Sequence, residues 1–283
     1  MSLRQSIAGY LKDFRGMTVQ PEQIIIGAGT EYLYGLLIQL LGHEAVYAVE
    51  NPGYQKIGKI YRNYQVNWTY IDMDDEGVEV SQLEEKKVDI VHISPSHHYP
   101  TGIVMPISRR YELLGWASKG EGRYIIEDDY DSELRLGGKP IPTLQSIDIS
   151  EKVIYMNTFT KTLASTVRIS YMILPRPLLE QFYQKLSFYS CTVSNFEQYT
   201  LDLFIKEGYF EKHINRLRNY YQNKKNGFLS AIWDSGLHKC VEISGEEAGV
   251  HFLMKLKTEK AEENVIELAK AQGIKLSPLS KFY

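Results

Sequence analysis

The sequence contains only two cysteines in 283 residues, Cys191 and Cys240. They show no metal-binding or redox spacing, and so few thiols are typical of a reducing compartment, so we expect a cytoplasmic protein. No apolar run is long enough to span a membrane, and no signal peptide is visible. The formal net charge is −3, which excludes a general basic field that would attract nucleic acid.

The composition, 43% hydrophobic and 24% charged, is that of a globular protein with a sizeable core. Short apolar strands alternate with helical segments through Tyr171, which predicts a mixed, mostly parallel sheet with helices on both faces. Two long helices are expected over residues 176–207 and 209–234, and then a strand, a helix and a strand. We predict a large α/β domain (1–175), linking helices (176–235) and a small, incomplete α+β C-terminal domain (236–283).

Residues 153–175 form the most informative stretch of the chain. An apolar run ends in a hydroxyl-rich turn with Thr158, Thr160 and Lys161, and Arg168 precedes a second apolar run. A lysine amine can form a Schiff base with a carbonyl cofactor, and burial eases the loss of its charge. Threonine hydroxyls and an arginine are donors that suit a phosphate group. The alternative is a structural lysine between two strands.

A second stretch, residues 124–131, is an apolar strand that ends in acidic residues around Tyr130. In an open α/β sheet, ligands bind beyond the carboxyl ends of the strands. Asp128 facing a pyridine nitrogen would keep that ring protonated, and a tyrosine hydroxyl could bond the phenolic oxygen of the ring. Pyridoxal phosphate (PLP) requires such an acid, a lysine and a set of phosphate ligands. The two stretches together therefore predict a PLP site.

A glycine turn near the N-terminus adds to this prediction. The apolar run of residues 24–26 breaks at Gly27, Gly29 and Thr30, just before an expected helix. Backbone N–H groups and the helix dipole make such a turn an anion site. The turn lacks the G-x-G-x-x-G spacing, so a dinucleotide-binding fold is not favoured. Beside Lys161 and Arg168, we interpret it as part of a phosphate site rather than a plain connection.

The chain resembles the aminotransferase-type domain of the MocR/GabR regulators, and the likeness is carried by the segments IIEDDYDSELR and NTFTKTLASTVRISYMILP. In full length, those regulators join a GntR-type winged helix to a PLP-dependent domain of fold type I. The resemblance extends from about Leu3 to about Gly236. It implies a seven-stranded sheet, a homodimer with active sites near the subunit boundary, and a small-molecule amino acid or amine as ligand.

The resemblance also implies a role for each matching residue. Lys161 resembles the Schiff-base lysine, Asp128 the partner of the pyridine nitrogen, and Tyr130 the partner of the phenolic oxygen. Tyr54 matches an aromatic residue that stacks on the ring, where stacking adds about 1 kcal/mol to area burial. The remaining matches are the phosphate ligands Gly29, Thr30, Thr158, Thr160 and Arg168.

Two departures from the aminotransferase pattern stand out. Residues 94–102 read SPSHHYPTG, where aminotransferases usually carry Asn-Pro-Thr-Gly with the asparagine on the ring oxygen. Tyr99 takes the asparagine's place, as in the regulators, so that role is not transferred to Tyr99. The adjacent His97 and His98 have no third ligand at useful spacing, so no metal site is predicted.

The second departure concerns the end of the chain. Family members carry an arginine there that binds the substrate carboxylate, but the last arginine here is Arg218, and lysine does not readily replace a bidentate fork. The winged helix that precedes the domain in the regulators is also absent. We therefore expect a truncated chain or an unusually short protein, which has a complete cofactor site but lacks the carboxylate clamp.

Three functions remain open from the sequence. The first is a PLP-binding domain that exchanges its Schiff base on Lys161 with an amino acid or amine and senses an effector for a MocR/GabR-type regulator. In that case this chain itself does not contact DNA or a membrane. The second is a free-standing class I/II aminotransferase that transfers an amino group from an amino acid to a 2-oxo acid. The third is a non-enzymatic α/β binding protein.

Overall fold

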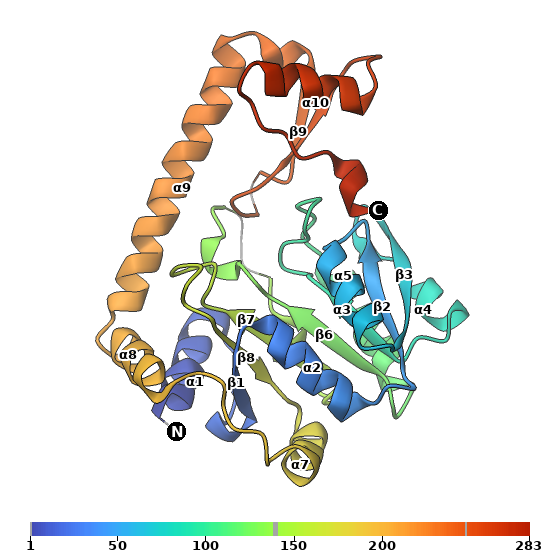
Figure 1. The fold of residues 1–283 in the computed structure, drawn as a ribbon, viewed down its shortest axis with the longest axis vertical. Coiled ribbons are helices and arrows are strands. Elements are labelled where there is room, and N and C mark those ends of the chain that lie inside the picture. The colour runs from blue at the N-terminus through green and yellow to red at the C-terminus, as the bar shows by residue number, and fades with distance from the viewer. Residues whose placement is uncertain (1, 138–140, 247) are drawn as a thin grey trace.

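An eight-stranded sheet forms the centre of the computed structural model, which describes residues 2–137, 141–246 and 248–283 (Figure 1). The strand order is β1-β8-β7-β6-β5-β2-β3-β4. Strands β3, β2, β5, β6 and β7 pair in parallel, whereas β8 is antiparallel to both β7 and β1. The strands are β1 (Ile24–Ala28), β2 (Val46–Asn51), β3 (Asn67–Asp74), β4 (Gly77–Val78), β5 (Ile90–Ile93), β6 (Tyr124–Asp128), β7 (Val153–Thr158) and β8 (Ile169–Ile173).

The predicted α/β fold with a mixed, mostly parallel sheet is confirmed, although the sheet has eight strands rather than seven. The extra strand, β4, has only two residues and pairs antiparallel with the edge strand β3. Gly77, at φ +121°, lets the chain turn back there, in a conformation that L side chains rarely adopt.

Helices cover both faces of the sheet because side chains alternate along each strand. On β7, Ile154 and Met156 pack under α2 and α7, whereas Val153 faces α4 and α5, and Tyr155 faces α1 and α8. The helices are α1 (Ser2–Arg15), α2 (Thr30–Leu41), α3 (Gln55–Asn63), α4 (Val80–Glu85), α5 (Ile107–Ser118), α6 (Leu144–Ile147), α7 (Arg176–Lys185), α8 (Asn195–Lys206), α9 (Tyr209–Asp234) and α10 (Glu262–Ala271), with 3-10 turns η1 (Pro21–Gln23), η2 (Ser132–Leu134), η3 (Leu237–Lys239) and η4 (Leu279–Phe282).

The prediction of one helix over residues 176–207 is wrong, because the structure has two helices there, α7 and α8. The second begins at a capping box. Ser194 accepts a hydrogen bond from the Glu197 backbone N–H, and the Glu197 side chain accepts one from the Ser194 backbone N–H. Such a box satisfies free N–H groups at a new helix start. The other expected long helix is confirmed as α9.

The C-terminal part lies at the far end of α9 (Figure 1). It contains the antiparallel pair β9 (Val241–Ser244) and β10 (Leu253–Leu256), followed by α10 and η4. The last strand expected from the sequence, after α10, is not formed. The chain returns to the main sheet there, since the Phe282 carbonyl accepts hydrogen bonds from the Gly53 backbone N–H at 2.9 Å and from Gln55 Nε2 at 2.8 Å. No helix among the described residues is long and apolar enough to cross a membrane.

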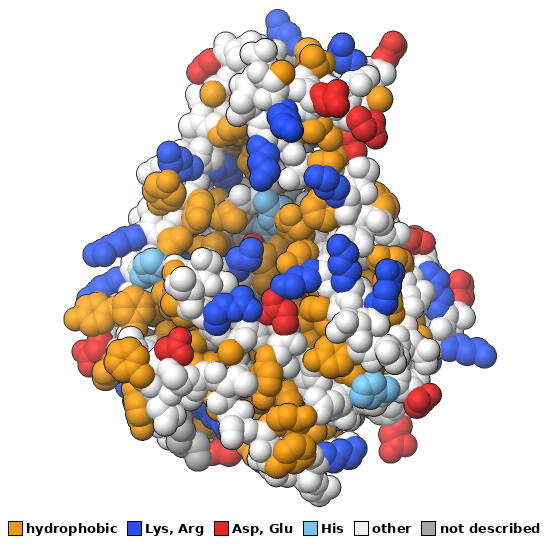
Figure 2. Space-filling model, in the orientation of Figure 1, with side chains coloured by type: hydrophobic (Ala, Val, Ile, Leu, Met, Phe, Trp, Pro, Cys, Tyr) orange, Lys and Arg blue, Asp and Glu red, His pale blue; other side chains and the backbone are white. Residues whose placement is uncertain are grey.

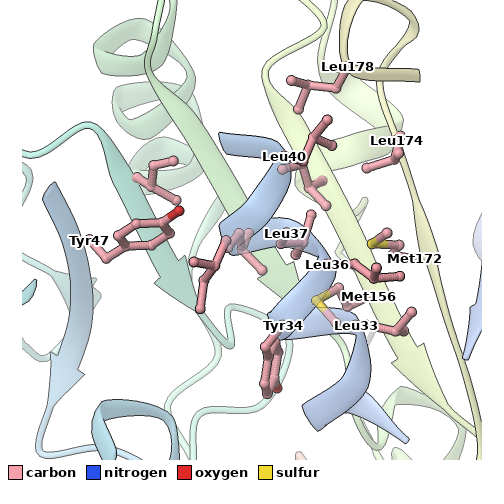
Figure 3. Close-up of a cluster of buried hydrophobic side chains, with 14 of the residues drawn as sticks. Leu33, Tyr34, Leu36, Leu37, Leu40, Tyr47, Met156, Met172, Leu174 and Leu178 are labelled. Carbon is pink, nitrogen blue, oxygen red and sulfur yellow. The ribbon is translucent and has the colours of Figure 1, made fainter. Parts of the chain in front are cut away.

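One core cluster holds α2 on the sheet (Figure 3). Leucines spaced three and four residues apart on α2 (Leu33, Leu36, Leu37 and Leu40) form one buried face. That face packs against Met156, Met172 and Leu174. The packing places the N-terminus of α2 near the ends of β6 and β7, where the candidate site lies.

We expect Leu37→Ala to destabilise the chain by about 2–5 kcal/mol, because it removes a fully buried side chain and leaves a cavity. Urea unfolding followed by circular dichroism measures the change. The matched control is Leu268→Ala on α10, where the side chain is 55% exposed and the expected change is within about 0.5 kcal/mol. Equal effects of the two substitutions would contradict this account of the core.

Candidate functional site

All nine residues named from the sequence line one cavity of about 340 Å³. Asp128 and Thr158 are the last residues of the neighbouring strands β6 and β7, and Thr30 opens α2. Lys and Arg side chains gather around a hollow near the middle of the face in Figure 2. The nine residues are Gly29, Thr30, Tyr54, Asp128, Tyr130, Thr158, Thr160, Lys161 and Arg168.

A buried carboxylate marks one end of this cavity. Asp128 is 8% exposed, and its Oδ2 accepts a hydrogen bond of 2.8 Å from the Tyr34 hydroxyl. His92 Nε2 lies 3.6 Å from the same oxygen. The other oxygen, Oδ1, has no hydrogen-bond partner among the described residues, and neither has the Tyr130 hydroxyl. Buried polar atoms are rarely left unpaired, so these two atoms suit a ligand with one N–H donor and one oxygen acceptor.

The opposite end is built to hold an anion. Gly29 precedes α2 with φ +93°, and a Cβ at this position would lie 2.4 Å from Arg168 Nη2. The positive φ strains any residue that has a side chain, so glycine is favoured here, and the free N–H groups of the first turn of α2 stay accessible. The Thr158 and Thr160 hydroxyls lie 3.0 Å apart. A helix N-terminus beside hydroxyls and an arginine is a phosphate-type site.

A glutamate that sequence analysis missed lies between the cations of this end. Glu31 Oε2 is 2.7 Å from Arg168 Nη2, and Lys56 Nζ donates to Glu31 Oε1. Burial opposes ionisation of Glu31, but the hydrogen bond and charge of Lys56, with the charge of Arg168, lower its pKa to about 2. The Glu31 carboxylate therefore occupies the position that the anionic group of a bound ligand would take. An acidic residue in the first turn of an expected helix was the available signal for Glu31, whereas nothing in the sequence pointed to Lys56.

Lys161 lies in the turn after β7, where the Leu163 N–H donates to the Phe159 carbonyl at 2.9 Å. Its side chain is exposed and makes no hydrogen bond with another described residue. The burial that we invoked from the sequence is therefore not observed. The amine lines the cavity and interacts electrostatically with Asp131, but it makes no salt bridge within the part of the chain that the structure describes, so a ligand can reach it.

Aromatic residues border the cavity. The Tyr54 ring is 52% exposed and meets the Tyr99 ring edge-on at 6.1 Å. Phe282 of η4 packs edge-on against Tyr99 at 5.1 Å. Tyr54 was predicted from the sequence, whereas Tyr99 was given no role and Tyr34 was not predicted. The positions of Tyr99 and Tyr34 at the cavity depend on contacts between distant segments, which the sequence does not show.

A second buried acid lies behind the site. Glu50 accepts hydrogen bonds from the Ser94 N–H at 3.1 and 3.2 Å, and burial raises the pKa of Glu50 to about 8. His98 Nε2 is 3.5 Å away, but burial lowers the pKa of His98 to about 3. The two side chains are close enough for an ion pair, yet both pKa shifts favour the neutral forms at pH 7. We take the pair as neutral because both groups are desolvated.

The family model for aminotransferase class I and II matches residues 1–283. The chain belongs to this family. Proteins of the family depend on PLP in general, and the aminotransferase-like domain predicted from the sequence is confirmed. The partnerless atoms of Asp128 and Tyr130 and the anion-binding end fit that cofactor, so the residues present agree with the family.

The similar curated proteins include several named as regulators and the aromatic-amino-acid aminotransferase 1 of Thermococcus litoralis, which is 27% identical over 99% of the chain and 69% of the relative. The chain is 42% identical to the uncharacterized HTH-type transcriptional regulator YdeL of Bacillus subtilis (strain 168), over 99% of the chain and 60% of the relative. It is 31% identical to the probable rhizopine catabolism regulatory protein MocR of Rhizobium meliloti, over 99% of the chain and 56% of the relative. The chain thus spans about 60% of the length of these relatives.

Similar solved structures are aminotransferases. The kynurenine aminotransferase of Pyrococcus horikoshii superposes with a TM-score of 0.83 at 29% identity, covering 100% of this chain and 72% of that one. The fold is therefore that of fold-type I aminotransferases, as predicted.

The raised pKa of Glu50 leads to an expected pH dependence of stability. Between the ordinary glutamate pKa and about 8, the folded state keeps a proton that the unfolded state releases. The free energy of unfolding should therefore fall by up to about 1.4 kcal/mol per pH unit as pH rises from 5 to 8. In Glu50→Gln this fall should be smaller. Urea unfolding at pH 5 and pH 8 tests it, with Glu44→Gln at an exposed position as control; identical slopes in all three proteins would contradict the burial effect.

Proposed function

We propose that this chain binds PLP through Lys161 and senses an amino acid or amine as the effector domain of a MocR/GabR-type transcriptional regulator. The observation that carries this proposal is that one cavity combines Asp128 Oδ1, which has no hydrogen-bond partner among the described residues, with the exposed amine of Lys161. When bound, PLP supplies an aldehyde that forms a Schiff base with an amine and a ring that withdraws electrons.

In this proposal, Asp128 holds a proton on the ring nitrogen. The Tyr34 hydroxyl bonds to Asp128 Oδ2 at 2.8 Å and leaves Oδ1 for the ligand. His92 lies behind the same oxygen and is itself 2.9 Å from the Tyr61 hydroxyl through Nδ1. These buried contacts fix the carboxylate before a ligand arrives, which reduces the cost of ordering it on binding.

Phosphate binding in this site requires Glu31 to release Arg168 and Lys56. Both cations line the cavity, beside Thr160 and the N-terminus of α2. A phosphate carries about −1.5 to −2 charge at pH 7 and offers three acceptor oxygens. It therefore competes well with a single carboxylate for this position.

The amine of Lys161 has two proposed roles. It would hold the cofactor in the resting state, and once an incoming amine had displaced it, the lysine could take or give a proton beside the ligand. The exposure of Lys161 leaves room for that exchange at the cavity mouth.

The regulator role is favoured over free-standing catalysis by YdeL, YhdI and MocR, which are named as regulators and share 42%, 39% and 31% identity with the chain, against 27% for an aromatic-amino-acid aminotransferase. The second candidate, an aminotransferase that transfers an amino group from an amino acid to a 2-oxo acid, is supported by the similar solved structures. A non-enzymatic binding protein is the third, and it requires Lys161 to be structural.

We also propose a cytoplasmic homodimer. Phe188, Phe196 and Tyr199 are 74%, 80% and 64% exposed, and exposed aromatic side chains on neighbouring segments are typical of contact surfaces. The domain limits at 175 and 235 and the absence of DNA contact by this chain stay predictions.

Lys161→Ala should abolish the adduct that borohydride reduction makes permanent, because only this amine would bond the cofactor. Mass spectrometry of the intact chain after incubation with PLP and reduction measures the adduct. Lys56→Ala tests the second lysine of the cavity, and Lys59→Ala removes an exposed lysine outside it. At saturating PLP both should keep the adduct; an adduct that persists in Lys161→Ala overturns the proposal.

Sensing and turnover differ in the amount of product. With a panel of amino acids and amines, and 2-oxoglutarate as acceptor, a sensor should lose its lysine-bound PLP absorbance and release at most about one 2-oxo acid per chain, because no cycle is completed. Absorbance and product quantification measure this. Continued release over many equivalents would favour the aminotransferase instead, and an unchanged spectrum with every ligand would contradict both.

A further inference from the structure

Three side chains from distant parts of the chain meet beside the candidate site. His97 lies after β5, Asp131 follows β6, and His251 lies two residues before the start of β10. His97 Nδ1 and Asp131 Oδ2 are 2.8 Å apart, and the rings of His97 and His251 stack with centroids 4.0 Å apart. Each residue offers one ligand atom, and the three atoms lie within 4.8 Å of one another.

This cluster is largely shielded from water. His97 is 2% and Asp131 3% exposed, and His251 is partly buried. His97 Nε2 is buried without a hydrogen-bond partner among the described residues. Gly249 allows the approach of the C-terminal segment, because a Cβ there would lie 2.3 Å from the His97 ring. The arrangement is thus a packed feature of the fold rather than a surface coincidence.

We propose that His97, Asp131 and His251 bind a divalent transition-metal ion of the zinc type. Two imidazoles and one carboxylate, with a fourth position for water, form a ligand set used by zinc sites, at metal–ligand distances of about 2.0–2.2 Å. Two ligands of one such ion lie at most about 4.4 Å apart. The present spread, within 4.8 Å, therefore requires only a small side-chain rotation.

The proposed ion would lie between His97 Nδ1 and Asp131 Oδ2, bound by a neutral imidazole and an ionised carboxylate. Sequence spacing concealed this site, because His251 lies far along the chain from His97. The expectation of no metal site rested on that spacing alone.

A metal here would link two parts of the molecule. His97 and Asp131 belong to loops of the main sheet, whereas His251 belongs to the segment that leads into β10. The His97 ring also stacks on Tyr130 at 6.2 Å, and Tyr130 lines the candidate cavity. The ion would therefore hold the C-terminal segment against the wall of that cavity.

Equilibrium dialysis against Zn²⁺, with elemental analysis, tests the proposal on the whole chain, with and without added PLP. The expected result is one Zn²⁺ per chain in both conditions, and a visible absorption spectrum of four-coordinate Co²⁺ when Co²⁺ replaces it. Zn²⁺ at 100 times its Kd should raise Tm by about 5–10 °C. His251→Ala should weaken binding at least about tenfold and remove the Co²⁺ spectrum.

The control is His43→Ala, which removes an exposed histidine and should bind like the unaltered chain. His251 is only partly buried, so its replacement tests the site even if His97→Ala fails to fold. The proposal is overturned by less than one bound Zn²⁺, by binding only when PLP is present, or by a His251→Ala chain that keeps the Co²⁺ spectrum. The experiment is independent of the PLP proposal, because loss of the cofactor adduct does not alter these readouts.

Discussion

The parallel pairing of β5, β6 and β7 is the constraint on which the site depends. In the register of β6 and β7, Asp128 pairs with Met156, so β6 ends two residues before β7. Asp128 and Thr158 therefore both lie at the same edge of the sheet. Because β8 returns antiparallel to β7, the turn between them, with Lys161, must lie at that edge as well. A shift of one residue in this register would turn Asp128 to the other face of the sheet.

The acidic residues at the end of β6 and just after it have different surroundings. Most contact other elements of the fold, whereas one of them lines the candidate cavity. Glu127 accepts backbone hydrogen bonds of 2.9 and 3.0 Å from the first turn of α6. Asp129 pairs with Arg15 of α1 at 2.9 Å, and Glu133 accepts from Asn157 at 3.1 Å. Each of these buried acids has a partner from another element. Asp129 Oδ1 and Glu133 Oε2 also have no hydrogen-bond partner among the described residues, but of these four acids Asp128 is the one that lines the cavity, where a ligand can reach its unpaired Oδ1.

The sequence was sufficient for features that local pattern determines. Strands that end in acids, a glycine before a helix and a hydroxyl-rich turn indicated most of the cavity residues, because the topology of an open α/β sheet brings strand ends together. Tyr54 was named only through the resemblance to the regulator family. Packing between distant segments was not accessible in this way. The Tyr34 hydroxyl contacts Asp128 only because α2 packs on β6 and β7. Lys56 is held at the anion end through its contact with Glu31. The exposure of Lys161 depends on which other segments pack over the turn after β7. The break between α7 and α8 was missed although the Ser194–Glu197 signature was present in the sequence.

The two ends of the cavity differ in how much they are prepared for a ligand. The Asp128 end is buried, held by Tyr34 and His92, and leaves one oxygen unpaired. The anion end is filled by Glu31, which neutralises Arg168 and Lys56. An uncharged ring alcohol in place of the phosphate would have to separate these charges without supplying an anion in return. Under the proposed function, a phosphorylated ligand would replace one negative charge by nearly two, so the Glu31 carboxylate at this position would make binding selective for the phosphate ester.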